Sequence, residues 1–245
     1  MNILSLCSGV GGLELGLKLA ITNTKVVCYV EIDPYCRRVL ATRMRDGFLD
    51  KAPVWDDLRT FDGLPWRGRV DCIASGFPCQ PFSLAGRRRG ATDSRNLWPD
   101  VRRVIGEARP RTVFLENVPA ILPYYYLEIR PGLSAMGYRV AEGIFSAAEV
   151  GAPHRRERLF ILAHARCGGE NGLQYESRAS GSAPTSGTGS EDGAGWWEAE
   201  PCILRVVDGL AHRVDRLAAL GNGVVSAVAA KAWTTLNGRL EGKGP

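Results

Sequence analysis

The stretch ILSLCSGVGGLELGLKLA, residues 3–20, joins an apolar run, a glycine-rich turn and a periodic apolar segment. The run Ile3 to Leu6 predicts a buried strand, and the spacing from Leu13 to Ala20 predicts a helix. Between them, the glycines of residues 8–12 allow the backbone to approach a ligand closely. A strand, a glycine turn and a helix in this order indicate the start of an α/β domain.

The same alternation continues along the chain. Apolar and β-branched runs predict further strands at Lys25–Val30, Val54–Trp55, Val70–Ala74, Val113–Leu115, Tyr138–Phe145 and Leu159–Ala163, and helical spacing predicts helices at Pro34–Met44 and Val224–Leu236. Strands that alternate with helices predict an α/β fold with a mainly parallel sheet. Residues 177–195 are rich in Gly, Ser, Thr and Ala and lack apolar periodicity, which indicates a linker, a disordered insert or a very small module.

Composition narrows the class of protein. The 245 residues are 45% hydrophobic, which is enough for a substantial core. A net charge of +5 permits a polyanionic partner but does not require one. The seven cysteines include no CxxC pair and no zinc-ligand spacing, so we expect reduced thiols and no metal. We expect a cytoplasmic protein, because there is no signal-peptide pattern and no apolar run that approaches a membrane span.

The sequence GFPCQPFS, residues 76–83, places Cys79 just after a predicted strand. A thiolate is a nucleophile, and nearby positive charge lowers the cost of forming it. Arginines 87–89 follow in a glycine-punctuated loop and supply such charge. When Cys79 is considered alone, a buried structural cysteine before a surface turn is the favoured interpretation.

Carboxylates follow several predicted strands. Glu31 lies at the end of the second strand, nineteen residues after Gly12, where it can accept from ribose hydroxyls. Asp57 can accept from an adenine amine, or it can cap a helix that starts at Leu58. Without a Gly-Lys-Ser/Thr sequence after the glycines, a nucleoside triphosphate is disfavoured. An ordinary glycine turn and a simple helix cap remain the alternatives.

Charged residues also flank the later strands. Glu116 in FLENVP directly follows a buried strand, where a carboxyl can carry a proton or bond the edge of a heterocycle. Arg156 and Arg158 share a face if they lie on a strand, and two guanidiniums suit a carboxylate, phosphate or carbonyl oxygen. Solvated charges at strand ends are the alternative.

Five motifs together resemble those of the DNA (cytosine-5) methyltransferases. They are SGVGG (8–12), GFPCQ (76–80), ENV (116–118), RRER (155–158) and LGNGVV (220–225), in the order usual for that family. The resemblance covers about residues 1–163 and 216–236. It implies a doubly wound, Rossmann-like sheet that binds S-adenosylmethionine without a metal. The catalytic domain is then residues 1–164 and 216–245, and residues 165–215 form a short, poorly ordered target recognition region.

The resemblance also implies a role for each matching residue. Cys79 attacks C6 of a flipped cytosine, Glu116 bonds N3 and the exocyclic amine, Arg158 contacts the ring carbonyl and Arg156 supports Cys79 or a phosphate. The residue that removes the C5 proton is not identified. The implied cofactor-binding residues are Cys7, Ser8, Gly9, Val10, Gly11, Gly12, Glu31, Ile32, Asp57, Leu58, Pro78, Asn222 and Val224. Cys7 and Ile32 stand where the family often has aromatic residues.

The implied partner is double-stranded DNA. The residues expected to contact it are Gln80, Ser83, Arg87, Arg88, Arg89, Arg95, Trp196, Trp197, Arg205, His212 and Arg213. The short recognition region predicts a short recognition sequence or loose specificity, and we expect a monomer that works with a cognate restriction endonuclease. Two alternatives stay open: a tRNA cytosine-5 methyltransferase of the same family, and a catalytically silent DNA-binding module.

Overall fold

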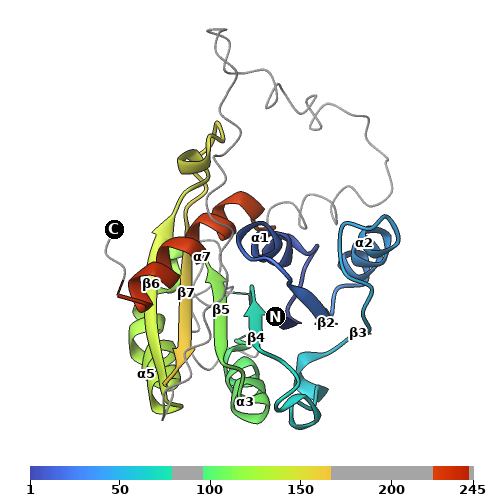
Figure 1. Ribbon diagram of the computed structural model, residues 1–245, viewed down its shortest axis with the longest axis horizontal. Coiled ribbons are helices and arrows are strands. Elements are labelled where there is room, and N and C mark those ends of the chain that lie inside the picture. Colours follow the sequence, from blue (N-terminus) through green and yellow to red (C-terminus); the bar gives the residue numbers. More distant parts are fainter. Residues whose placement is uncertain (79–95, 167–222, 243–245) are drawn as a thin grey trace, which may run out of the picture.

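The computed structural model describes residues 1–78, 96–166 and 223–242, which form one seven-stranded sheet covered by helices on both faces (Figure 1). The strands are β1 (Asn2–Leu6), β2 (Lys25–Val30), β3 (Val54–Trp55), β4 (Cys72–Ser75), β5 (Thr112–Asn117), β6 (Tyr138–Phe145) and β7 (Arg158–Ala165). Their order in the sheet is β3-β2-β1-β4-β5-β7-β6. The first five strands are mutually parallel, and β7 runs antiparallel to both β5 and β6. The predicted α/β class with a mainly parallel sheet is therefore confirmed.

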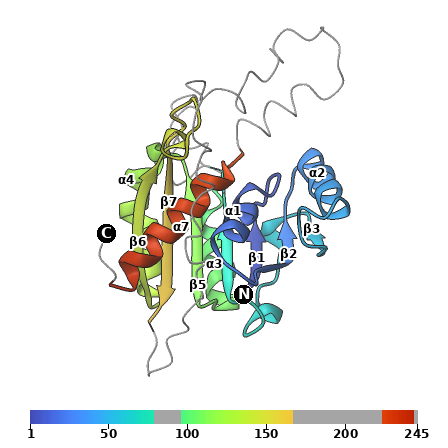
Figure 2. The same cartoon turned by 45° about the horizontal axis from the view of Figure 1, so that its top comes forward.

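Helices pack on the two faces in separate layers, which Figure 2 shows from a second direction. The main helices are α1 (Gly12–Ala20), α2 (Pro34–Arg45), α3 (Trp98–Ala108), α4 (Leu122–Tyr124), α5 (Arg130–Ala135) and α7 (Ser226–Leu240). Single turns lie at Leu58–Thr60, Leu64–Trp66, Pro119–Ile121, Tyr125–Ile129 (a π turn) and Ala147–Val150. Side chains alternate along each strand, so Phe114 packs in the core with α1, α2 and α7, whereas Val113 and Leu115 pack in the core with α3 and α5.

Local sequence explains where α2 begins. The Asp33 carboxylate accepts hydrogen bonds from the backbone N–H groups of Tyr35 and Cys36, and Pro34 occupies the first turn, where its missing N–H costs nothing. Arg43 and Arg45 lie in the last turn, where positive charge opposes the helix dipole. The predicted helix over residues 34–44 is one residue shorter than the observed one.

Two helices differ from the sequence-based expectation. Helix α3 was not predicted, although its buried residues follow helical spacing; they are Trp98, Val101, Val104, Ile105 and Ala108. It forms the crossover that the parallel strands β4 and β5 require. Helix α7 covers residues 226–240, whereas residues 224–236 were predicted. It starts later because Val225 is extended, with φ −76° and ψ 110°.

Nowhere in the described ranges does a helix have the length and apolar content needed to cross a membrane.

Candidate active site

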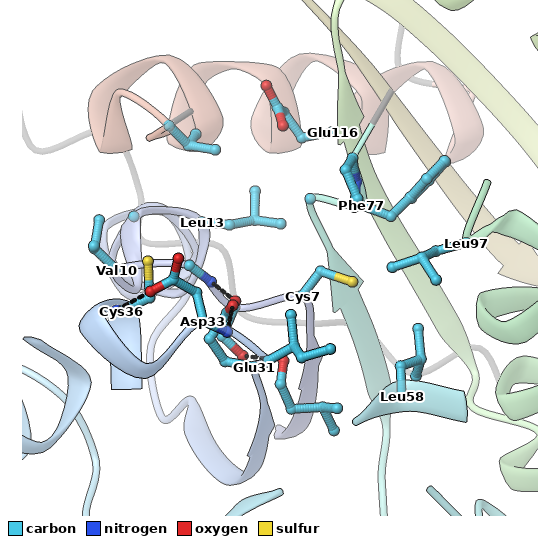
Figure 3. Close-up of a pocket in the computed structure, with 18 of the residues that line it drawn as sticks. Cys7, Val10, Leu13, Glu31, Asp33, Cys36, Leu58, Phe77, Leu97 and Glu116 are labelled. Carbon is cyan, nitrogen blue, oxygen red and sulfur yellow. Dashed lines mark hydrogen bonds between the residues drawn. The ribbon is translucent and has the colours of Figure 1, made fainter. Parts of the chain in front are cut away.

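A cavity of about 410 Å³ opens at the carboxyl ends of the parallel strands (Figure 3). It lies where the strand order reverses between β1 and β4, which is the usual ligand site of an open α/β sheet. Segments that follow β1, β2, β3, β4 and β5 contribute to its wall. Because β7 is antiparallel, its first residue, Arg158, reaches the same edge.

The turn after β1 is held by a carboxylate from the next strand. Glu31 accepts the backbone N–H of Gly9 on Oε2 at 2.6 Å and the N–H of Asp33 on Oε1 at 2.8 Å. Gly9 has φ +54°, a left-handed conformation that favours glycine. Burial raises the pKa of Glu31, while the backbone N–H groups of Asp33 and Gly9 oppose this shift. The carboxylate is thus fixed in orientation at the cavity wall.

Gly12 allows the C-terminal segment to close over the turn. A Cβ on Gly12 would lie 2.6 Å from the carbonyl oxygen of Val224, so a side chain there would push that segment away. The hydroxyl of Ser226 donates to the Gly12 carbonyl at 2.9 Å and strengthens the contact. Gly223 and Val224 consequently reach the cavity wall.

Asp57 caps a turn, as the sequence allowed, and it also lines the cavity. Its Oδ1 accepts the backbone N–H of Arg59 at 2.9 Å, so it caps the turn at residues 58–60. The same residue and its neighbour Leu58 line the cavity. The cap holds the carboxylate in place beside the cavity.

The opposite end of the cavity holds a buried ion pair. Nε of Arg158 lies 2.9 Å from Oε1 of Glu116, and both side chains are less than one-fifth exposed. Glu116 pairs with Phe160 in the sheet, so Arg158, two residues earlier on β7, lies diagonally across on the same face. Burial raises the pKa of Glu116 to about 7, and the guanidiniums of Arg158 and Arg156 partly oppose the shift.

Arg156 and Arg158 do not lie on one strand, so the condition under which they would share a strand face is not met. Strand β7 begins at Arg158, and Arg156 has φ +32°, a left-handed conformation incompatible with a strand. Its guanidinium donates instead to the carbonyl of Gly223, just before α7. Arg156 therefore connects the arginine motif with the C-terminal segment, and it is not among the residues that line the cavity.

Asn117 fixes the segment that leads to Cys79. Its side-chain amide donates to the Phe77 carbonyl at 3.0 Å, and its carbonyl oxygen accepts the N–H of Val118 at 2.9 Å. The end of β5 is thereby tied to residues 76–78, and Pro78 lines the cavity directly before Cys79. The sequence singled out the motif that contains Asn117 but predicted no role for this residue.

The cavity brings most of the described candidate residues together. Those that line it are Cys7, Ser8, Gly9, Val10, Gly12, Glu31, Ile32, Asp57, Leu58, Pro78, Glu116, Arg158 and Val224. Gly11 does not line it; it precedes α1 with φ +85°, and a Cβ there would lie 2.6 Å from Cδ1 of Leu49. The candidates outside the described residues are Cys79, Gln80, Ser83, Arg87, Arg88, Arg89, Arg95, Trp196, Trp197, Arg205, His212, Arg213 and Asn222.

Several lining residues were not predicted from the sequence. They include Glu14, Asp33, Cys36, Arg59 and Leu97. Glu14 carried no usable signal, because acidic residues are common in the first turn of a helix and its burial depends on how α1 packs on β1. Leu97 carried none, since its approach depends on how α3 packs.

Cys7 lines this cavity, and its surroundings do not favour nucleophilic attack. Burial raises the pKa of its thiol to about 12, and the charge of Glu31 adds to the shift. At neutral pH the Cys7 thiol is therefore protonated and a poor nucleophile.

The chemistry of the wall fits S-adenosylmethionine. The volume suits a cofactor, carboxylates of Glu31 and Asp57 can accept from hydroxyl and amine groups, and one buried oxygen of Glu14 has no partner among the described residues. Within residues 1–78, 96–166 and 223–242, no group of three His, Cys, Asp or Glu side chains could hold a metal ion.

Comparison with known proteins agrees with this chemistry. A family model described as C-5 cytosine-specific DNA methylase matches residues 1–181. The Type II methyltransferase M.NgoMIV of Neisseria gonorrhoeae is 32% identical over 164 residues, which are 65% of this chain and 50% of that protein. The Escherichia coli enzyme M.Eco47II is 34% identical over 185 residues, 71% of this chain and 42% of that protein. The chain thus spans about half the length of the curated relatives it matches.

Solved structures give a similar result. The S. pombe Dnmt2 methyltransferase aligns with a TM-score of 0.56 and 26% identity, over 69% of this chain and 52% of that chain. A putative DNA modification methyltransferase encoded within an E. coli prophage aligns with a TM-score of 0.55 and 28% identity, over 67% of this chain and 47% of that chain.

Proposed function

Because this chain belongs to the C-5 cytosine-specific DNA methylase family, we propose that it methylates carbon 5 of cytosine in double-stranded DNA, with S-adenosylmethionine as the methyl donor. One observation supports this most directly. The buried Glu116–Arg158 pair lies in the same cavity as the glycine turn after β1, and Pro78 brings the chain to that cavity directly before Cys79.

In this proposal, Cys79 makes carbon 5 reactive. The Cys79 thiolate adds to C6 of the cytosine, and the electron pair of the C5–C6 double bond becomes available at C5. S-adenosylmethionine supplies an electrophilic methyl group. A base then removes the proton from C5, and elimination restores the double bond and releases the thiolate. Since C6 is shielded in a duplex, the cytosine must leave the base stack first.

Glu116 and Arg158 hold the ring while its charge changes. With a pKa near 7, Glu116 retains a proton in much of the protein at neutral pH, so it can donate to N3 as negative charge develops there. We assign Arg158, which pairs with Glu116, to donate to the ring carbonyl oxygen. Arg156 donates to the Gly223 carbonyl and so connects the segment before β7 with the segment before α7.

The remaining wall would hold the cofactor. We assign the ribose hydroxyls to Glu31, the adenine amine to Asp57 and the methionine end to residues 8–12. Val224, and Asn222 outside the described residues, complete this side of the cavity.

The proposal also covers how the chain is divided into regions and which partners it has. Residues 1–164 and 216–245 form the catalytic domain, and residues 165–215 form a short target recognition region with DNA contacts from Trp196, Trp197, Arg205 and Arg213. The Type II name of the relatives supports a place beside a restriction endonuclease. We propose a cytoplasmic monomer that acts on duplex DNA.

Methylation sequencing tests this function. Unmethylated plasmid DNA is incubated with the purified chain and S-adenosylmethionine, with Cys79→Ala as the control variant. We expect methylated cytosines in one short sequence context, absent with the variant, and a covalent adduct with duplex DNA that contains 5-fluorocytosine. Methylation of tRNA alone would contradict the DNA assignment, and a folded chain that binds DNA without modifying it or forming an adduct would indicate a silent binding module.

A further inference from the structure

Glu14 is a buried carboxyl group that the proposed reaction does not use. It lies in the first turn of α1, is 1% exposed and contributes to the cavity wall. Its Oε2 has no hydrogen-bond partner among the described residues. Leaving a buried carboxylate oxygen without a donor is costly, so native proteins rarely tolerate it unless another group binds there.

The other oxygen of Glu14 is already engaged. Ser5 on β1 forms a hydrogen bond with Oε1 of Glu14, and the hydroxyls of Ser5 and Ser8 lie 2.6 Å apart. A hydroxyl donates only one proton, so with Glu14 charged the order of donation is Ser8 to Ser5 to Glu14. This series of hydrogen bonds fixes the carboxyl between β1 and the glycine turn and leaves the buried Oε2 as the oxygen without a partner among the described residues.

The charges near Oε2 favour a cationic donor. Glu31, from the end of β2, is close enough to raise the pKa of Glu14. Arg43 on α2 is the basic residue that acts on Glu14, but its guanidinium donates to the Val10 carbonyl. Two carboxylates, Glu14 and Glu31, thus lie near the turn against the single guanidinium of Arg43, which keeps its charge when it donates to a carbonyl. The local potential therefore suits a positively charged ligand group.

We propose that Glu14 binds the α-ammonium group of the methionine moiety of the cofactor. The inference rests on the proposed use of S-adenosylmethionine and names the residue that recognises this group. Oε2 accepts from the ammonium, while Ser5 and Ser8 hold the carboxyl in orientation. A role limited to the helix dipole does not explain the burial, because an exposed glutamate in the first turn would serve as well.

The proposal implies that cofactor affinity depends on pH. Burial raises the pKa of Glu14 to about 7. The Ser5 hydroxyl, the backbone N–H of Glu14 itself and the charge of Arg43 oppose the shift, and the charge of Glu31 increases it. Tyr29 on β2 also senses this charge, but burial keeps it protonated at neutral pH. Only the charged carboxylate pairs with an ammonium. Affinity should therefore rise about tenfold from pH 6 to pH 8, as the ionised fraction increases.

Calorimetric titration with two ligands tests the proposal. One ligand is S-adenosylhomocysteine, and the other is its analogue that lacks only the amino group. At pH 8, we expect Glu14→Gln to lower the affinity for S-adenosylhomocysteine at least tenfold. The affinity of the variant for the analogue should stay within twofold of the wild-type value. Glu149→Gln, at an exposed glutamate paired with Lys231, should change neither affinity.

The outcomes separate this inference from the proposed function. If Glu14→Gln weakens the binding of both ligands equally, Glu14 has a structural role and this inference alone is overturned. If the variant weakens the binding of neither ligand, this inference is overturned as well. If the wild-type chain binds neither ligand, the proposed cofactor fails as well. The wild-type pH dependence needs no variant: equal slopes for the two ligands between pH 6 and 8 would also overturn the inference.

Discussion

Two buried carboxyl groups, Glu14 and Glu116, share a pKa raised to about 7 but have different partners. Glu116 faces the guanidiniums of Arg158 and Arg156, whereas Glu14 faces hydroxyls, the Glu31 carboxylate and the guanidinium of Arg43. Glu116 is proposed to work with its proton, and Glu14 is proposed to work without one. In these proposals, groups of one chemical type serve two purposes because their surroundings, and the ligand groups assigned to them, differ.

Glu116→Gln tests the need for a titrating proton. Above about pH 7 the wild-type carboxyl loses the proton that N3 requires, so the single-turnover methylation rate should fall as pH rises from 7 to 9. The variant should be slower by roughly 100-fold and should lack this decline. Glu149→Gln should retain the wild-type profile. A decline that persists unchanged in Glu116→Gln would assign it to another group.

The pH dependence of the unfolding free energy, measured without ligand, should reflect the burial of Glu14. Its pKa is about 7 in the folded chain and 4.5 in the reference state, so the unfolded chain loses the proton first. The contribution of this group to stability is therefore complete below pH 4.5 and is lost by about pH 7. Glu14→Gln should reduce the pH-dependent loss of unfolding free energy between pH 4.5 and 8 by about 3 kcal/mol in urea titrations. An unchanged loss would show that Glu14 is not buried as described.

At the scale of secondary structure, the contact between α1 and α7 positions the C-terminal wall of the cavity. Gly16 makes this contact possible, since a Cβ there would lie 2.5 Å from Cβ of Ala229 and 2.7 Å from the Ser226 carbonyl oxygen. Together with the hydrogen bond from Ser226 to Gly12, this close approach brings Val224 to the cavity. The distance between α7 and α1 thus sets where Val224 lies in the cavity wall.

Two glycine-to-alanine substitutions in helices should have opposite effects. Gly16→Ala should destabilise the chain by about 1–3 kcal/mol and weaken S-adenosylhomocysteine binding, because α7 must shift. Gly106→Ala in α3 is the matched control, since its Cβ would meet nothing closer than Sδ of Met136 at 3.9 Å. It should stabilise the chain by about 0.5–1 kcal/mol. Denaturant titrations compare them, and equal effects would contradict the proposed close packing.

At the scale of the whole molecule, the cavity joins distant parts of the chain. Its wall includes residues from Cys7 to Val224, contributed by five parallel strand ends, the start of β7 and the segment before α7. None of these segments can form the wall alone. Ligand binding should consequently stabilise the fold as a unit, because the unfolded chain has no such site.

Thermal unfolding measures this coupling. S-adenosylhomocysteine at 100 times its dissociation constant should add about 2.7 kcal/mol of stability and raise the Tm by roughly 5–10 °C. A nucleoside triphosphate at the same concentration should not shift the Tm, because the glycine turn lacks the lysine of a phosphate-binding loop. A shift with the triphosphate alone would refute the assignment of the cavity.

The sequence alone determined the α/β class and the candidate residues Glu31, Glu116 and Arg158, because strand runs, glycine turns and short motifs are local features. The tertiary structure decided what these residues contact. The Arg158–Glu116 pair depends on the antiparallel register of β7 against β5, and the contact of Arg156 with Gly223 spans 67 positions. The open oxygen of Glu14 depends on how α1 packs on β1. Such features were beyond sequence patterns because burial and pairing are set by long-range packing.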